Sequence, residues 1–409
     1  KSARNWGRLG MKYNRYKIKD LISEISMGPF GSNIKVECFV DSGIPVLNGS
    51  NLIGFALNDG SFRYVTEEKA NSLGKANAYR GDVVITHRGT LGQIVFIPSD
   101  SKFERYVISQ SQFRVKCNEK IMPEYLTYYF HTKIGQHKLL SNASQVGVPA
   151  LARASTSFQE LEIEIPPMIQ QQKVVSLLET IRVKIELNNA INDNLYEMVN
   201  AYYTSLFKDV ECEMTTIGNY AERIYSGGTP TTSNAAYWGG TFGWFSSGET
   251  RNRFVISTEK SITQTGIDNS STKLASKHDI VMASAGQGFT RGQTSMLLID
   301  TYVNQSVIVI HADRNILPYL FWNLANRYEE LRAISDSSSI RGSLTTKMIA
   351  AFEIPLANND VIQTFSDFAW AVIPQIENNL LENERLAALR DSLLPKLMSG
   401  ELDVSAIEL

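Results

Sequence analysis

The feature that most constrains the fold is a long internal repeat. Residues 107–126 read VISQSQFRVKCNEKIMPEYL, and residues 302–320 read YVNQSVIVIHADRNILPYL. Gln110 recurs as Gln305 and Pro123 recurs as Pro318, in each case 195 residues later. This period is too long for a solenoid of short repeats, so we expect two copies of one domain.

The repeat extends well beyond this segment. GDVVITHRGTLGQIVFI (81–97) corresponds to HDIVMASAGQGFTRGQTSMLLI (278–299), and SQVGVPALARASTSFQELEIEIPP (144–167) corresponds to DSSSIRGSLTTKMIAAFEIPL (336–356). Short apolar runs alternate with glycine-containing polar loops in both copies. This pattern predicts two strand-rich domains, with a short helix after each shared proline.

A long amphipathic helix is predicted after each copy. Apolar residues recur every three or four positions from Gln172 and again from Gln363, and neither run contains glycine. If the first helix carries the chain to the second domain, the second helix must run back for its apolar stripe to be covered. The order domain, helix, domain, helix therefore predicts an antiparallel helix pair of about 60 Å.

Polar residues and prolines interrupt these helical patterns. Asn188 and Asn379 fall at matching places in the two apolar seams. Each is either a solvated edge position or part of a buried polar pair that fixes the register. Pro374 is expected to kink the second helix or delay its start, and Pro395 to kink it or end it early.

Composition limits the class of protein. Of 409 residues, 43% are hydrophobic, but no uninterrupted apolar run is long enough to cross a membrane. The cysteines (Cys38, Cys117 and Cys212) form neither a disulfide framework nor a metal pattern, which favours a cytoplasmic protein. Residues 1–11 are expected to form a weakly structured leader.

Charge is unevenly distributed along the chain. Residues 1–165 carry a formal charge of +6 and residues 357–409 carry −6. A phosphate-binding surface fits the first of these blocks. The acidic block fits a protein-binding face, or a solvated surface of no special function.

Catalytic motifs are missing from the sequence. It contains no Walker A motif, no G-x-S-x-G, no HExxH and no Cys/His cluster. GQGFTRG (286–292) imitates a nucleotide-binding loop, but it leads into a predicted strand instead of a helix. A non-catalytic binding protein is therefore favoured, whereas a coiled-coil adaptor for protein or glycan and an enzyme with a divergent site remain alternatives.

Several segments together resemble one protein family. They are GPFGSNI (28–34), GIPVLNGSNL (43–52), SGGTPTTSNAAYWGG (226–240), FGWFSSGE (242–249) and LRDSLLPKLMSGEL (389–402). In this order they resemble the specificity subunit of type I restriction–modification enzymes along nearly the whole chain. Residues 1–11 and Pro374 depart from the family pattern.

The resemblance implies an α+β fold. Two strand-rich α/β target-recognition domains, residues 12–165 and 213–356, would lie in a pseudo-twofold arrangement. Two long antiparallel coiled-coil helices, residues 166–212 and 357–402, would join them.

The resemblance also implies a function. Each domain would read one half of a bipartite, asymmetric double-stranded DNA target. The helices would set the unread spacer and dock two modification subunits, and restriction subunits would complete the nuclease. The chain itself would hold no cofactor, because S-adenosylmethionine, ATP and Mg belong to the partner subunits.

Candidate DNA contacts are residues with forked donors, amides or hydroxyls in the repeated loops, because such groups read base edges and phosphates. In the first domain they are Ser32, Lys35, His87, Arg88, Thr90, Gln110, Gln112, Arg153 and Thr156; in the second they are Thr229, Thr231, Arg251, Gln287, Arg291, Gln305 and Arg341. Gln110 and Gln305 could instead form the solvated side of a half-buried strand. The predicted partner-binding helix positions are Ile181, Ile185, Asn188, Leu195, Val372, Ile376, Asn379 and Leu386.

Overall fold

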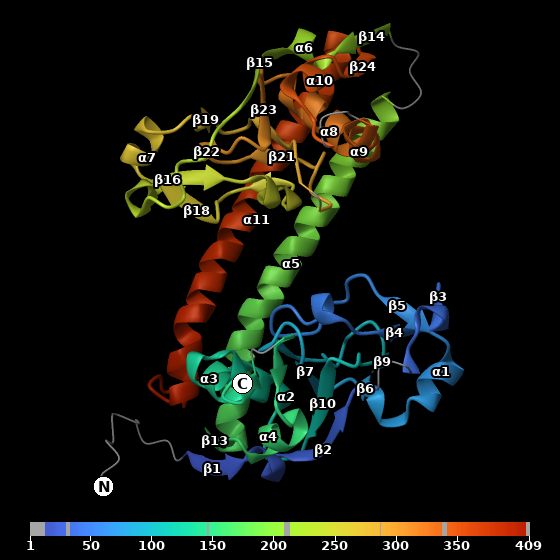
Figure 1. Cartoon of the computed structure of the whole chain (residues 1–409), viewed down its shortest axis with the longest axis vertical. Helices are drawn as coiled ribbons and strands as arrows, with labels where there is room; N and C mark the ends of the chain where they lie inside the picture. Colours follow the sequence, from blue (N-terminus) through green and yellow to red (C-terminus); the bar gives the residue numbers. More distant parts are fainter. Residues whose placement is uncertain are drawn as a thin grey trace. The chain divides into compact units, whose positions relative to one another are not determined.

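The computed structural model describes residues 13–29, 33–144, 147–207, 213–286, 288–337 and 342–405. The chain forms two compact units, residues 1–183 with 386–409, and residues 184–385. Each unit contains one copy of the repeat and part of both long helices (Figure 1). In each unit short strands form a main sheet and a smaller sheet, and helices pack on the main sheet, so the predicted α+β fold is confirmed.

The main sheet of the first unit is antiparallel. Its order is β2 (Ile22–Met27), β10 (Gln112–Cys117), β7 (Asp82–Thr86) and β8 (Ile94–Phe96). Strands β7 and β8 are buried on both faces. Val83 and Ile85 of β7 pack in a core with helix α2 (Pro123–His131), whereas Val84 packs in a second core beneath the smaller sheet. Apolar residues at successive positions in β7 therefore fill two cores.

The smaller sheet of the first unit carries part of the candidate site. Its order is β3 (Phe39–Val40), β5 (Arg63–Val65), β4 (Ile44–Val46), β9 (Arg105–Val107) and β6 (Asn77–Tyr79). Strands β4 and β9 run parallel and meet at Val46 and Val107. The segments that follow both strands therefore leave the sheet at the same end.

The second unit repeats this arrangement. The main sheet has the order β15 (Ala221–Ser226), β23 (Val307–Ala312), β20 (Ile280–Ala283), β21 (Thr294–Leu297) and β17 (Phe254–Val255). The smaller sheet has the order β18 (Lys260–Ile262), β16 (Trp238–Phe245), β22 (Thr301–Val303) and β19 (Lys273–Ala275), with β16 and β22 parallel. Strand orders and directions match those of the first unit, apart from the additional strands β3 and β17. The internal duplication is confirmed.

Each unit closes with an antiparallel strand pair that leads into a long helix. The pairs are β1 (Asn14–Lys17) with β13 (Glu162–Ile165), and β14 (Glu213–Thr216) with β24 (Glu353–Leu356). The helices that follow are α5 (Met168–Phe207) and α11 (Asn359–Ser399), which are 40 and 41 residues long. At 1.5 Å per residue each measures about 60 Å.

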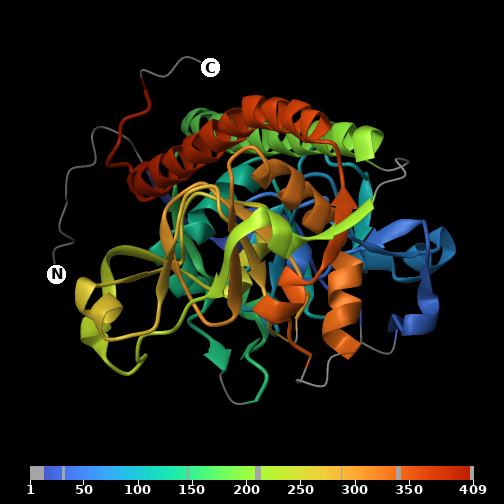
Figure 2. The same ribbon diagram turned by 90° about the horizontal axis from the view of Figure 1, so that it is seen from above.

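The two long helices pack antiparallel, as the chain order predicted. Asn188 bonds to Asn383, whereas Asn192, one turn further along α5, bonds to Asn379, one turn earlier on α11. Figure 2 shows the two helices side by side. Helix α11 begins well before Pro374 and continues past Pro395, so the expected late start and early end are both wrong. No helix among the described residues is long and apolar enough to cross a membrane.

Candidate nucleic-acid interface

Four segments of the first unit meet at one end of its main sheet. They are residues 28–29, 87–91, 109–112 and 149–153, which we call the first reading edge. The amide of Gly28 donates a hydrogen bond to the carbonyl of Gln112, and the amide of His87 donates one to the carbonyl of Ser111. The N···O distance is 2.8 Å in both. Leu151 donates to the carbonyl of His87 over 2.9 Å. Segments that are far apart in sequence thus form one continuous surface.

The second unit has an equivalent surface, the second reading edge, formed by residues 227–232, 284–286, 288–292, 304–306 and 342–344. Gly227 donates to the carbonyl of Asn304 over 3.2 Å. Ser284 donates to Ser306, and Leu344 donates to Ser284, both over 2.8 Å. The His87–Ser111 and Leu151–His87 bonds of the first edge thus have direct counterparts here.

Glycines at the start of both edges allow the backbone to pack closely. A Cβ atom added at Gly28 would lie 1.9 Å from the carbonyl oxygen of Ser109, and one added at Gly227 would lie 1.9 Å from that of Val303. No side chain fits at such distances. These glycines allow the edge segments to pack against one another.

Most residues of the first domain that were predicted to contact DNA have exposed side chains. Arg88, Thr90, Gln110 and Arg153 are exposed on the edge, and Lys35 and Thr156 are exposed in neighbouring segments. Arg153 adopts a left-handed backbone, with φ 48°, directly before helix α4 (Ala154–Glu160). This set includes three cationic side chains, which suits a polyanionic ligand.

His87 is the most constrained of these candidates. Its Nε2 lies 3.0 Å from the carbonyl oxygen of Gln110, which fixes Nε2 as the protonated nitrogen. Burial lowers the pKa of His87, although its backbone hydrogen bonds oppose this shift. The imidazole is therefore neutral at neutral pH and braces the loop that carries Gln110.

Two predicted contacts take structural roles and are withdrawn. Gln112 is 1% exposed, and its Oε1 accepts the amide of Ser109 over 2.9 Å. Arg291 is 8% exposed, donates to the carbonyl of Gly342 over 2.6 Å and pairs with Asp336. Both side chains hold the edges together. Three other predicted contacts, Ser32, Gln287 and Arg341, lie outside the described residues.

Among its described residues, the second edge presents fewer available groups. The hydroxyl of Thr229 donates to Oε1 of Gln305, which leaves the amide nitrogen of Gln305 as a donor. Arg251, which lies beside the edge, is exposed but donates to the carbonyl of Gly248 over 2.7 Å and pairs with Glu259. Thr231 is exposed, and its carbonyl accepts the indole N–H of Trp238 over 3.2 Å.

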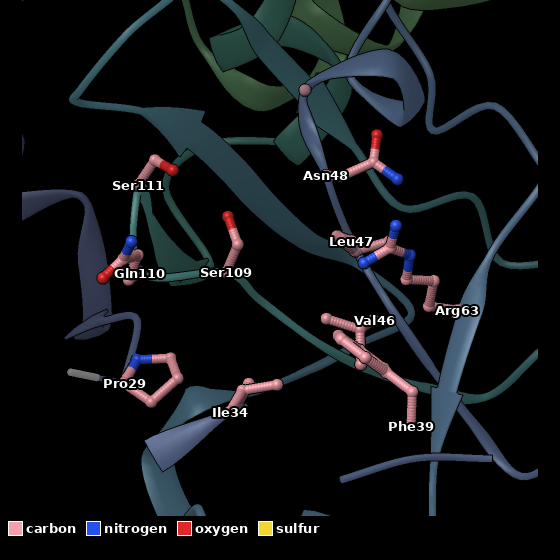
Figure 3. Close-up of a pocket in the computed structure, with 11 residues that line it drawn as sticks. Pro29, Ile34, Phe39, Val46, Leu47, Asn48, Arg63, Ser109, Gln110 and Ser111 are labelled. Atoms are coloured by element: carbon pink, nitrogen blue, oxygen red, sulfur yellow. The ribbon is translucent and has the colours of Figure 1, made fainter. Parts of the chain in front are cut away.

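A cavity beside the first edge contains residues that the sequence did not single out. Its volume is about 440 Å³, and Asn48 and Arg63 line it together with Gln110 (Figure 3). Asn48 begins a capping-box turn with Asn51, and Ser246 and Glu249 form the same turn in the second unit. Both turns lie inside the motifs GIPVLNGSNL and FGWFSSGE, so the motif match was the available signal.

The predicted partner-binding positions form the seam between the helices. Ile181, Asn188, Val372, Ile376 and Asn379 are buried within the chain, and Ile185, Leu195 and Leu386 are half-buried. The five buried positions therefore do not face a partner, whereas a partner contact of the half-buried Ile185, Leu195 and Leu386 stays a prediction. The buried alternative for the two asparagines is confirmed, but Asn188 bonds to Glu382 and Asn383, and Asn379 to Asn192, instead of to one another.

A different face of α5 is exposed and apolar. Leu187, Ile191 and Met198, which we call the α5 stripe, are all exposed, Leu187 to 55%. At 100° per residue they fall within about 40° of one another around the helix. An aligned, exposed apolar stripe outside the seam is a typical protein-binding surface.

Comparison with known proteins identifies the family. A family model described as "Type I restriction modification DNA specificity domain" matches residues 32–197 and 210–382. The specificity subunit of the type I restriction enzyme HindI from Haemophilus influenzae is 21% identical, with 79% of this chain and 87% of that protein covered. The specificity subunit of the type I restriction enzyme MjaIX from Methanocaldococcus jannaschii is 20% identical, with 98% and 96% covered.

A solved structure supports the fold. The type I restriction–modification S subunit from M. genitalium matches with a TM-score of 0.59 and 14% identity, covering 95% of this chain and 96% of that one. The cofactors of such a system belong to its modification and restriction subunits, and the specificity subunit is non-catalytic. The adaptor and enzyme alternatives are thereby set aside. The chain belongs to the family of type I restriction–modification DNA specificity subunits and has two target-recognition domains.

Proposed function

We propose that each reading edge reads one half of a bipartite, asymmetric DNA target. The target-recognition domains are proposed to span residues 12–165 and 213–356, and the segments 166–212 and 357–402 contain the long helices α5 and α11. The observation that carries the proposal is the shared hydrogen-bond pattern: in both units the amide of His87 or Ser284 and the carbonyl of Ser111 or Ser306 join the candidate loops over 2.8 Å. Two equivalent surfaces suit a target with two half-sites.

The proposed DNA contacts are the exposed members of the predicted set together with the half-buried Thr229. They are Lys35, Arg88, Thr90, Gln110, Arg153 and Thr156 in the first domain, and Thr229, Thr231, Arg251 and Gln305 in the second. His87 acts as a positioning residue for Gln110. Glutamine pairs with adenine through its amide, and arginine pairs with guanine or phosphate.

The repeat supplies a matched pair of variants for a test. Gln110→Ala and Gln305→Ala remove the same side chain from equivalent positions of the two edges. Binding of the chain with its modification subunits would be measured on duplexes with both halves intact, or with one half scrambled. Gln110→Ala should weaken discrimination in the first half by about 5-fold to 150-fold, the range for one good base contact, and leave the second half unchanged.

Two outcomes would count against parts of this proposal. If the wild-type complex binds intact and scrambled duplexes equally at all salt concentrations, DNA reading by these edges is refuted. If selectivity is normal and neither glutamine variant changes it, both glutamines belong to the solvated side of their strands. The proposal then rests on the remaining exposed residues.

The helices are proposed to set the spacer and to dock two modification subunits. The α5 stripe supports docking, because its side chains are apolar and exposed although most other exposed residues of α5 are polar. Leu187→Lys should reduce assembly with the modification subunit. Ala190→Lys introduces the same side chain at an exposed position about 60° around the helix from Leu187, on the side away from the seam. This control variant should not reduce assembly. Equal assembly of both variants, measured by analytical ultracentrifugation, would exclude the stripe.

The remaining partners follow from the type I assignment. Restriction subunits that use ATP and Mg are proposed to join the complex of this chain and its modification subunits. The modification subunits would supply the S-adenosylmethionine site and methylate adenine. A cytoplasmic location is proposed, because the substrate and all partners are intracellular.

A further inference from the structure

The cavity beside the first reading edge has an apolar floor and a polar rim. Ile34, Phe39 and Val46 form the floor, and Asn48, Arg63 and Gln110 stand on the rim (Figure 3). The cavity adjoins the reading edge, because Ser109, Gln110 and Ser111 of that edge also line it. The cavity is therefore part of the surface that is proposed to meet DNA.

Arg63 lies where the smaller sheet ends at this surface. It is the first residue of β5 and pairs with Val46 of β4, which in turn pairs with Val107 of β9. Asn48 and Gln110 follow shortly after the ends of β4 and β9. The three rim side chains are thus held by three adjacent strands, which positions them more firmly than a long loop would.

The guanidinium of Arg63 has an aromatic neighbour. Its central carbon lies over the ring of Phe39, 5.2 Å from the ring centre, which suits a cation–π contact. A cation–π contact of this kind engages no N–H group of the guanidinium as a hydrogen-bond donor. Within the ranges that the structure describes, no hydrogen bond or ion pair engages these N–H groups.

The second unit differs at the equivalent place. Phe245 pairs with Val303 there, as Val46 pairs with Val107, and Trp244 pairs with Lys260. Glu259, the next residue in this register, forms an ion pair with Arg251. The position of Arg63 in the first domain thus corresponds to that of Glu259 in the second, where the ion pair with Arg251 neutralises the charge.

We propose that Arg63 is a specificity-determining residue that reads a guanine in the first half of the target, an inference that rests on the proposed function. The planar fork of arginine donates two hydrogen bonds to O6 and N7 of guanine. Asn48 and Gln110 beside it carry amides, which are groups that pair with base edges. Guanine is favoured over phosphate because Asn48 and Gln110, whose amides pair with base edges, line the same cavity as Arg63.

The test uses duplexes in which each guanine of the first half-site is replaced, one at a time, by 7-deazaguanine. The affinity of the complex with modification subunits would be measured for wild type, Arg63→Ala, Arg63→Lys and Arg105→Ala. Arg105, the first residue of β9, is the charge-matched control because β9 runs from there toward the reading edge. Thermal unfolding of each variant would verify that it is folded.

In the wild type, 7-deazaguanine at one position of the first half-site should weaken binding more than at the others. Arg63→Ala should bind the target about 5-fold to 150-fold more weakly, and its affinity should no longer respond to 7-deazaguanine at that position. Arg63→Lys should keep the charge but lose most of the discrimination. Arg105→Ala should respond as the wild type does.

Three results would overturn the inference. They are a first half-site without guanine, an unchanged 7-deazaguanine response in Arg63→Ala, and a sequence-independent loss that Arg63→Lys restores, which identifies a phosphate contact. In each case the wild type would still distinguish intact from scrambled half-sites. Loss of that selectivity in the wild type would instead refute the proposed function.

Discussion

Asn188→Ala should weaken the pairing of the two long helices by about 2 kcal/mol. Asn188 is 1% exposed, and its amide nitrogen donates to Oδ1 of Asn383 over 2.9 Å and to Glu382 over 2.7 Å. Loss of the bond to Asn383 costs about 1 kcal/mol. The small cavity left by truncation costs about another 1 kcal/mol, because the packed seam cannot fully close around it.

Native-state hydrogen exchange of the amides in residues 184–195 would measure this change, because it reports local opening in a chain with two folded units. Asn194→Ala is the matched control, since it makes the same substitution at an exposed position of the same helix. A double-mutant cycle with Asn383→Ala should give a coupling energy of about 1 kcal/mol. The pKa of Glu382, which its hydrogen bond from Asn188 holds below the usual range, should rise in the variant. Zero coupling, together with equal effects of Asn188→Ala and Asn194→Ala, would refute this account of the seam.

Further predictions concern pH, packing and length. Burial lowers the pKa of His131 in the folded protein. This residue therefore contributes stability above its unfolded pKa, and that stability is lost as the pH falls through its folded pKa. The first unit should lose less stability on acidification in His131→Gln, and equal pH profiles of the variant and the wild type by calorimetry would contradict this. Gly227→Ala should cost about 1–3 kcal/mol because its Cβ would meet the Val303 carbonyl, whereas Gly288→Ala, in open space, should be near neutral in thermal unfolding. Inserting a heptad into both long helices adds about 10.5 Å and should change the length of the unread spacer; an unchanged spacer would refute the spacing role of the helices.

The duplication and the helices could be predicted because they depend on local patterns. The repeated Gln-Ser segments and the unbroken 3–4 residue spacing identify elements without knowledge of the packing. The late start expected at Pro374 was wrong because proline propensity is local, whereas the nearby side chains of Ile373 and Ile376 are buried and stabilise α11 by tertiary packing.

The candidate site could be predicted only in outline. Polar residues in repeated loops marked the two reading edges, but burial separated Gln112 and Arg291 from the exposed candidates. Arg291 pairs with Asp336, 45 residues away, and Gln112 caps its own turn, so neither role is visible in a repeat alignment. Arg63 was missed because it approaches the edge through the pairing of β5 with β4, which the sequence does not specify.

The division of labour between the two domains is tested most directly by mapping methylated bases in DNA from cells that contain this chain and its modification subunit. The same map would be made with a chain in which residues 213–356 are replaced by the corresponding domain of a relative. We predict that one half of the methylated sequence changes while the other half is retained. A change in both halves, or in neither, would contradict the assignment of one half-site to each domain.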